Sequence, residues 1–448
     1  MKKLLPILLL LLSTAAFAQT KTDSLAGKVD RMEKALRILR EFRIVSYVQF
    51  QFQRADTAGA RSFAGGDFPA MANNRFMIRR GRLKLLFDHE GKKGFRIFQT
   101  TFQIDVTERG FQARDFWGRI IDPWTGWVGL QGGMMDRPFG FEVTTGDDNR
   151  ESPERGRMSQ TILPAEKDLG AELVIESPKT FKPVYVRLDA GIFNGTGVNL
   201  SSFTNHKDFI GRIQARKAFT LKNTTLTLSG GASYYHGGVL QQTPFIFDLE
   251  KNSEGRMVYT RLTESSAVNK TYHKRQYYGV DMQLGLDYKL GATTFRGEFI
   301  GGQQPGTNTA NIAPVLPGAF DLNIRHFRGL YAYFVQTFKQ NLKDGHTIYH
   351  DFVVKYDWYD PNTQVAQKDL STILDAHTCG ADIQYHTIGV GYTFRPYEFF
   401  QLQFYYDVVK NAATREVGFD RDLKDNVFTL RAQFKFDTDW FNRKVKLI

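Results

Sequence analysis

Residues 277–289 read YYGVDMQLGLDYK, and apolar side chains occupy every second position through most of this stretch. Because successive side chains of a β-strand point to opposite faces, the segment has one apolar face and one polar face. The apolar face carries Tyr278, Val280, Met282, Leu284, Leu286 and Tyr288, and the other carries Asp281, Gln283, Asp287 and Lys289. A strand buried on both faces would instead read as a continuous apolar run. We therefore expect this strand to lie between lipid and water.

The same period of two recurs along the chain from Arg43 onward. Residues 425–436 place Phe428 and Phe434 on the expected lipid face, with Thr429 and Gln433 toward the interior. Most such segments are close to the roughly 9–11 residues that a tilted strand needs to cross a bilayer. We expect an all-β fold, an antiparallel transmembrane β-barrel of about 16 strands. The segments are 43–53, 76–88, 94–106, 112–121, 126–135, 168–176, 183–193, 208–218, 224–235, 277–289, 293–301, 327–338, 347–359, 382–394, 399–409 and 425–436. The faces of 112–121 and 327–338 are ambiguous and are left unassigned.

The connections between these segments alternate in length. Short ones include 89–93, 122–125 and 290–292, and the longest are 136–167, 236–276, 302–326 and 360–381, with 107–111 as the exception. Short turns at one end and long loops at the other are typical of membrane barrels. A soluble β-sandwich or propeller would also give many strands, but it would not predict this alternation.

The N-terminal residues predict export. Lys2 and Lys3 precede an apolar run, Leu4 to Leu12, and Ala16-Phe17-Ala18 supplies small residues at the cleavage positions. We expect residues 1–18 to be a signal peptide, because the run is too short to span the roughly 30 Å of hydrocarbon in a bilayer.

Residues 22–42 have a different period. Apolar residues recur at spacings of four, three, four and three, at Leu25, Val29, Met32, Leu36 and Leu39. This is the seam of a coiled coil, although it covers only about two heptads. Two interpretations stay open: an amphipathic helix packed on the barrel mouth, or a short periplasmic coiled coil that assists trimer formation. The expected domains are 19–42, periplasmic and helical, and 43–448, the barrel.

Basic side chains are expected to line the barrel interior, and the whole chain has a formal net charge of +12. If Leu83 and Leu85 face lipid, then Arg82 and Lys84, which alternate with them, face the channel. The candidate solute-binding residues in the lumen are Arg80, Arg82, Lys84, Arg212, Arg216, Arg431 and Lys435. Guanidinium groups bind phosphate or carboxylate oxygens in a fork geometry. The alternative for each arginine is a structural ion pair with a lumen Asp or Glu. Phe76 and Ile78, inward by the same phase, leave a sugar channel open.

Three stretches resemble a known family: Arg79-Arg80-Gly81-Arg82-Leu83 through Gln103-Ile104-Asp105, Gly132 to Gly140 (GGMMDRPFG), and Leu163 to Gly170 (LPAEKDLG). Together they are similar to the phosphate-selective porins of types O and P found in Bacteroidetes-like genomes. The resemblance implies a sixteen-stranded, trimeric outer-membrane channel whose third outer loop folds into the lumen. Basic side chains there would attract oxyanions.

Residues 136–167 are the third outer loop by this count. The candidate constriction residues are Arg137, Arg150, Arg155 and Arg157. The loop has five basic and seven acidic residues, so a uniformly cationic constriction is not what its own sequence predicts.

The expected function is therefore a porin that allows passive diffusion of small solutes, with a preference for anions such as phosphate. Motifs of hydrolases, zinc proteases and nucleotide-binding loops do not occur in the sequence, so no catalytic residue, metal or cofactor is expected. The expected partners are small anionic solutes, outer-membrane lipid and two further copies of the chain, and no nucleic acid. A structural or adhesive barrel, or a specific sugar or peptide channel, is the alternative.

Overall fold

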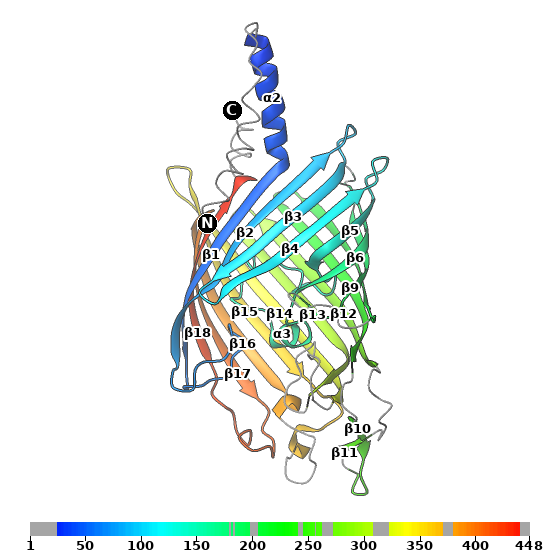
Figure 1. Ribbon diagram of the computed structural model, residues 1–448. Coiled ribbons are helices and arrows are strands. Elements are labelled where there is room, and N and C mark those ends of the chain that lie inside the picture. Colours follow the sequence, from blue (N-terminus) through cyan, green and yellow to red (C-terminus); the bar gives the residue numbers. More distant parts are fainter. Residues whose placement is uncertain are drawn as a thin grey trace, which may run out of the picture.

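Sixteen antiparallel strands form a closed barrel (Figure 1). The computed structural model describes residues 25–178, 181, 184–197, 205–240, 245–255, 257–261, 272–307, 322–370 and 380–439. Each barrel strand pairs with its sequence neighbours, and β1 pairs with β18 to close the sheet. The barrel strands are β1 (Phe42–Ala55), β2 (Asn74–Glu90), β3 (Arg96–Thr107), β4 (Gly110–Ile121), β5 (Val128–Asp136), β6 (Lys167–Glu176), β7 (Tyr185–Phe193), β8 (Asp208–Leu221), β9 (Thr224–Leu240), β12 (Tyr272–Tyr288), β13 (Gly291–Gly306), β14 (Leu322–Asn341), β15 (Thr347–Asp360), β16 (Tyr385–Tyr397), β17 (Phe400–Asn411) and β18 (Val427–Asp437).

All sixteen predicted segments are strands of this barrel, so the predicted fold class is confirmed. The strands differ more in length than the sequence suggested: β5 has 9 residues and β14 has 20. The longer strands continue beyond the barrel wall toward the long loops (Figure 1). Within the long connection 236–276, a hairpin of β10 (Ile246–Lys251) and β11 (Met257–Arg261) was not predicted.

The outer surface of the barrel is apolar, as the alternation predicts. Val280 and Met282 on β12 are 56% and 66% exposed, whereas Asp281 between them is 8% exposed and faces the interior. On β18, Phe434 is exposed while Arg431 and Gln433 are buried inside. Such a band of exposed apolar side chains around a closed sheet is stable in a bilayer and not in water. The chain is an outer-membrane β-barrel.

A β-bulge in β2 changes one predicted face. Gln49 lies opposite Arg80 and Phe50 opposite Ile78, so Arg79 is an extra residue. An extra residue reverses the inward and outward positions beyond it. The expectation that Phe76 and Ile78 face the lumen is therefore wrong: both are exposed on the outer wall, and Met77 is buried inside. Phe76 and Ile78 therefore no longer support the sugar channel that the sequence left open.

The two ambiguous segments have separate explanations. In β4, Gln103 lies opposite Asp115 and Ile104 opposite Ala113, so a second bulge at Arg114 breaks the alternation. In β14 the inward face is itself apolar and aromatic, with Tyr331 and Tyr333 buried against the interior. Apolar residues on both faces remove the signal that distinguishes lipid from lumen.

Residues 137–166, called the inner loop from here on, lie inside the barrel. They include the short helix α3 (Arg157–Ile162), which appears within the lumen in Figure 1. Phe139, Met158 and Ile162 are buried and pack with the aromatic wall residues Tyr235 and Tyr277 in one cluster. Burial of these side chains against the wall anchors one side of the loop. The prediction that this connection folds into the lumen is confirmed.

The long loops pack on one another at their end of the barrel. A second cluster joins Phe247 of β10 and Tyr259 of β11 with Leu370 and Phe419 of other loops. Beneath it, Arg325 donates to Asp382 at 2.8 Å, and both side chains are fully buried. The β10–β11 hairpin lies at this end in Figure 1.

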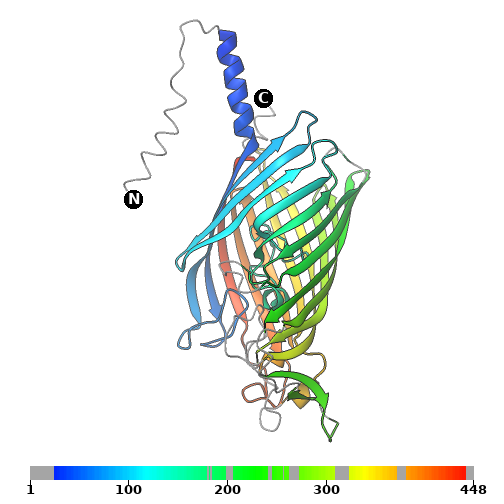
Figure 2. The ribbon, with the colours of Figure 1, turned by 45° about the vertical axis from the view of Figure 1, so that its right-hand side comes forward.

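Helix α2 (Leu25–Glu41) projects from the end of the barrel with the short turns, directly before β1 (Figure 2). Val29, Met32, Leu36 and Leu39 of the predicted seam are 47–64% exposed. A helix packed on the barrel mouth would bury this stripe, so the exposed seam favours the coiled-coil interpretation. The predicted signal peptide, residues 1–18, lies outside the described residues. In the described part, no helix is long and apolar enough to cross a membrane.

A charge on the lipid face should destabilise the barrel far more than one on the inner face. Val280 lies near the middle of β12 and faces outward, so Val280→Arg should lower the free energy of unfolding of the barrel from lipid bilayers by about 2–4 kcal/mol. Gln283→Arg is the matched control, because this inward residue neighbours Asp281, to which it donates a hydrogen bond. Equal losses in denaturant titrations of the two variants would contradict the assigned faces.

Candidate functional site

The inner loop is attached to the barrel wall by ion pairs. Each of its six carboxylates lies within ion-pair distance of at least one basic wall residue. The pairs are Glu142 with Lys355, Asp147 with Arg80 and Arg82, Asp148 with Lys435, Glu151 with Arg296, Glu154 with Arg79, Arg80 and Arg431, and Glu166 with Arg114. The net negative charge of the inner loop is thus opposed by basic side chains of the barrel wall.

Glu154 is paired with three arginines of the barrel wall. Arg79, Arg80 and Arg431 reach its carboxylate at 2.7, 2.8 and 2.8 Å. Because of the bulge in β2, the consecutive residues Arg79 and Arg80 both reach it, which a regular strand would not allow. Burial alone would raise the pKa of the Glu154 carboxyl, but the three guanidinium groups outweigh burial and hold the pKa well below its usual range. Glu154 is therefore ionised at neutral pH.

Asp147 is the second point of attachment. Its carboxylate lies 3.0 Å from Arg80, 2.5 Å from Arg82 and 2.7 Å from Arg150 of the loop itself. Desolvation favours the neutral acid, yet Arg80 and Arg82 hold the pKa of Asp147 well below its ordinary value. Gln49 of β1 also donates to the Asp147 backbone carbonyl at 3.1 Å. Of the three candidate lumen residues on β2, Arg80 and Arg82 are thus bound to the inner loop and Lys84 is not.

The remaining candidate lumen residues are placed differently. The Lys84 side chain is 32% exposed and lies 3.5 Å from Asp115, which Lys167 approaches more closely at 2.7 Å. Arg212 is buried and paired with Asp281 at 2.7 Å. Arg216 is exposed, with its guanidinium carbon 5.2 Å from the Tyr185 ring centroid. Lys84 and Arg216 are therefore more accessible to a solute than the others on their strands.

The four candidate arginines of the inner loop are all buried. Arg137 pairs with Asp168 of β6 at 3.2 Å, and both side chains are fully buried. Arg150 pairs within the loop, and Arg155 lies 3.2 Å from Glu166 and donates to backbone carbonyls. Arg157 has no ion pair in the described part of the chain and instead stacks on aromatic rings.

The loop and its ion-paired wall residues together carry a positive surplus. Counted over the described residues, twelve basic side chains take part in these pairs or belong to the loop, against nine acidic ones. The wall acids in this count are Asp105, Asp168 and Asp357. By this count, the region where the inner loop meets the wall is of mixed sign, with a surplus of three positive charges.

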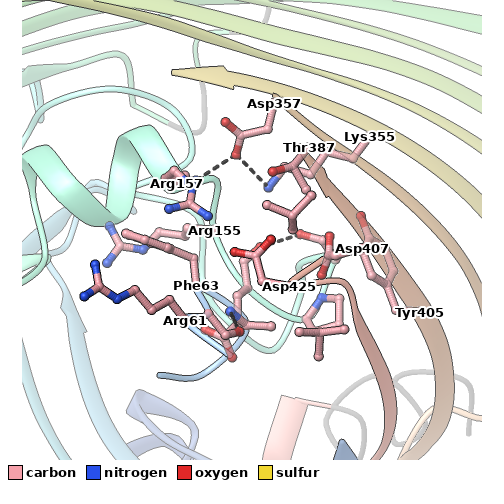
Figure 3. A pocket seen from close by; sticks show the side chains of 17 residues that line it. Arg61, Phe63, Arg155, Arg157, Lys355, Asp357, Thr387, Tyr405, Asp407 and Asp425 are labelled. Atoms are coloured by element: carbon pink, nitrogen blue, oxygen red, sulfur yellow. Dashed lines mark hydrogen bonds and ion pairs between the residues drawn. The ribbon is translucent and has the colours of Figure 1, made fainter. Parts of the chain in front are cut away.

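A pocket on the long-loop side of the inner loop holds residues that the sequence did not single out. About 460 Å³ of space between its lining residues is free of protein atoms, with open solvent included. Its lining includes Arg61, Phe63, Lys355, Asp407 and Asp425, together with Arg155 and Arg157 (Figure 3). The only sequence signal for Lys355 and Asp407 is their inward phase on alternating strands. No group of metal-binding side chains occurs within the described ranges.

Similar barrels are found among solved structures. The outer-membrane channel DcaP of Acinetobacter baumannii is 13% identical, with 88% of this chain and 97% of that one aligned and a TM-score of 0.47. An anion-selective porin from Comamonas acidovorans is 9% identical over 88% and 99%, with a TM-score of 0.44. OmpT of Vibrio cholerae, in a trimer form, is 9% identical over 88% and 99%, with a TM-score of 0.45. The sequence matches no protein-family model and no curated protein.

The chain's own geometry defines its class. A closed antiparallel sheet with an apolar outer surface surrounds a polar interior, and one long loop is folded inward and attached by ion pairs. These features define a porin-type outer-membrane β-barrel.

Removing the Glu154 charge should release the inner loop. In Glu154→Gln, three arginines lose their shared carboxylate, and breaking such buried pairs typically costs about 3–5 kcal/mol. We expect a lower unfolding midpoint, noisier single-channel current and a reversal potential shifted toward anions. Glu398→Gln, at an exposed carboxylate in a short turn, is the control. Current traces of Glu154→Gln identical to those of the control would exclude an ion-paired attachment of the loop.

Proposed function

We propose that the chain is a porin for passive diffusion of small solutes with a preference for anions. The observation that carries this proposal is the positive surplus where the inner loop meets the wall. Ions that cross the lumen pass this region, and the sign of its field decides which ions are concentrated there. The acidic inner loop lowers the surplus but does not reverse it.

The basic residues have two roles in this proposal. Arg80, Arg82 and Arg431 are bound to inner-loop carboxylates and supply the field. Lys84 and Arg216 are more exposed and meet the passing ion. A weak, exposed cation suits conduction, because an ion must leave the site as readily as it enters. The sequence resemblance to phosphate-selective porins supports phosphate or another oxyanion as the solute.

Ion selectivity in planar bilayers tests this function. Under a salt gradient, the reversal potential should indicate a higher permeability for chloride than for potassium, and added phosphate should reduce the chloride current. Lys84→Gln should lower the anion-to-cation permeability ratio by about twofold, because it removes one of few exposed lumen cations. Lys92→Gln, an exposed change in a short turn, should leave the ratio unaltered. Equal permeability of the two ions would refute the anion preference, and absence of conductance would refute the porin.

We further propose that three copies assemble as a trimer through α2 and through the part of the barrel wall that the short strands β3 to β7 form. The exposed seam of α2 needs apolar partners, and a second and third copy supply them. Strands β3 to β7 have 9 to 12 residues, and the β3–β4 hairpin ends well short of the long loops in both views (Figures 1 and 2). Its tip carries the exposed charges Glu108 and Arg109, which protein covers better than lipid does.

Light scattering of the purified protein in detergent tests the trimer. Met32→Asp with Leu36→Asp should reduce the protein mass from three chains toward one, because charges in the seam oppose helix association. Arg31→Asp, which alters charge outside the seam, is the control and should leave the mass at three chains. A monomeric mass for the unaltered protein would refute the trimer.

A further inference from the structure

The pocket between the inner loop and strands β15 to β18 has the composition of a ligand site. Residues from several parts of the chain meet there: the loop after β1, the inner loop up to the start of α3, the inward faces of β15, β16 and β17, and the loop before β18, which carries Asp425 (Figure 3).

The cationic side of the pocket is held by aromatic rings. The guanidinium carbon of Arg157 lies 3.6 Å from the ring centroid of Tyr385 and 4.3 Å from that of Phe63. Stacking on both rings fixes the plane of the guanidinium group. Its Nε is buried and has no hydrogen-bond partner. In contrast to the other three arginines of the inner loop, Arg157 forms no ion pair with the described residues.

On the anionic side of the pocket, buried hydrogen-bond acceptors have no donor among the described residues. Asp425 is 2% exposed, and neither of its carboxylate oxygens has a hydrogen-bond partner within the described residues. Asp407 lines the same space, and the Tyr405 hydroxyl there is buried and unpartnered too. Burial raises the pKa of the Asp425 carboxyl. A buried carboxylate left unsatisfied is costly, so its presence calls for a compensating donor.

The pocket as a whole is neutral. Its lining has four basic side chains, Arg61, Arg155, Arg157 and Lys355, and four acidic ones, Glu154, Asp357, Asp407 and Asp425. Several of these are already paired: Glu154 with wall arginines, Arg155 with Glu166, and Lys355 with Glu142. Asp357 lies 3.8 Å from Lys355. The charged lining groups without an ion pair among the described residues are then the guanidinium groups of Arg61 and Arg157 and the carboxylates of Asp407 and Asp425. They are of opposite sign and lie on different elements.

We propose that this pocket binds a small zwitterion of the amino-acid type. The ligand's carboxylate would meet Arg157, and its ammonium group would meet Asp425 and Asp407, with the Tyr405 hydroxyl as a further acceptor. The site rests on the proposed porin function and names a solute class that the pore takes up selectively. A simple anion would satisfy Arg157 but leave Asp425 and Asp407 uncompensated, and a simple cation would leave Arg157 uncompensated.

Three molecules of nearly equal size separate these requirements. L-Alanine carries both charges, lactate replaces the ammonium group by a hydroxyl, and isopropylamine replaces the carboxylate by a methyl group. The full-length protein is reconstituted into liposomes, and uptake of each isotope-labelled compound is measured over a range of concentrations. We expect saturable uptake of L-alanine, and uptake of lactate and isopropylamine that rises linearly with concentration.

Substitutions in the pocket then test the assigned groups. Asp425→Asn should reduce L-alanine uptake at low concentration by about tenfold, because it removes a charge-assisted hydrogen bond. Asp407→Asn should act in the same direction. Asp420→Asn, an exposed carboxylate in the same loop as Asp425, is the matched control and should behave as the unaltered protein. Heat-modifiable migration on gels confirms that each variant still forms the barrel.

The possible outcomes distinguish failure of the proposed zwitterion site from failure of the proposed porin function. Conductance in the same preparation shows whether the porin function holds. If the protein conducts but L-alanine uptake is linear, or is the same in Asp425→Asn and Asp420→Asn, the zwitterion site is refuted and the porin stands. If saturable uptake extends equally to lactate, the site selects anions and the proposed class is wrong. If the unaltered protein does not conduct, both proposals fail.

Discussion

The ion pairs between the inner loop and the barrel wall are the interaction on which the lumen depends. Burying unpaired charge is costly, so a loop with six carboxylates would be unstable inside an apolar or acidic interior. Here the wall presents eight basic partners, and each carboxylate finds at least one. The position of the inner loop and the mixed sign of the charge around it follow from this pairing.

The pairing also changes the roles that can be assigned to Arg80 and Arg82. On the sequence alone, Arg80 and Arg82 read equally well as binding sites for solute or as members of structural pairs. In the folded chain they hold Asp147 and Glu154. In the proposed porin, attachment of the inner loop and ion selectivity would therefore depend on the same residues.

The two sides of the lumen are held by different forces. Around β9 and β12 to β14, Phe139 and Met158 pack the inner loop against aromatic wall residues, and around β1, β2 and β18 ion pairs do so. Between these regions the pocket beside β15 to β18 has both aromatic rings and unpaired charge. A site that combines stacking surfaces with groups of either sign arises where the apolar and the charged halves of the lumen meet.

The sequence by itself determined the barrel, since alternation of apolar and polar side chains is a local property of each strand, and sixteen strands with alternating loop lengths could be counted from it. The resemblance of three stretches to phosphate-selective porins also implied that residues 136–167 fold inward. Only the tertiary structure decided which face Phe76 presents, because one extra residue at Arg79 reverses the phase and leaves no local signal. It also decided the partners of Glu154 and the neighbours of Arg157 and Asp425. Those contacts join residues hundreds of positions apart, and the spacing of residues along the chain carries no information about which of them meet across a lumen.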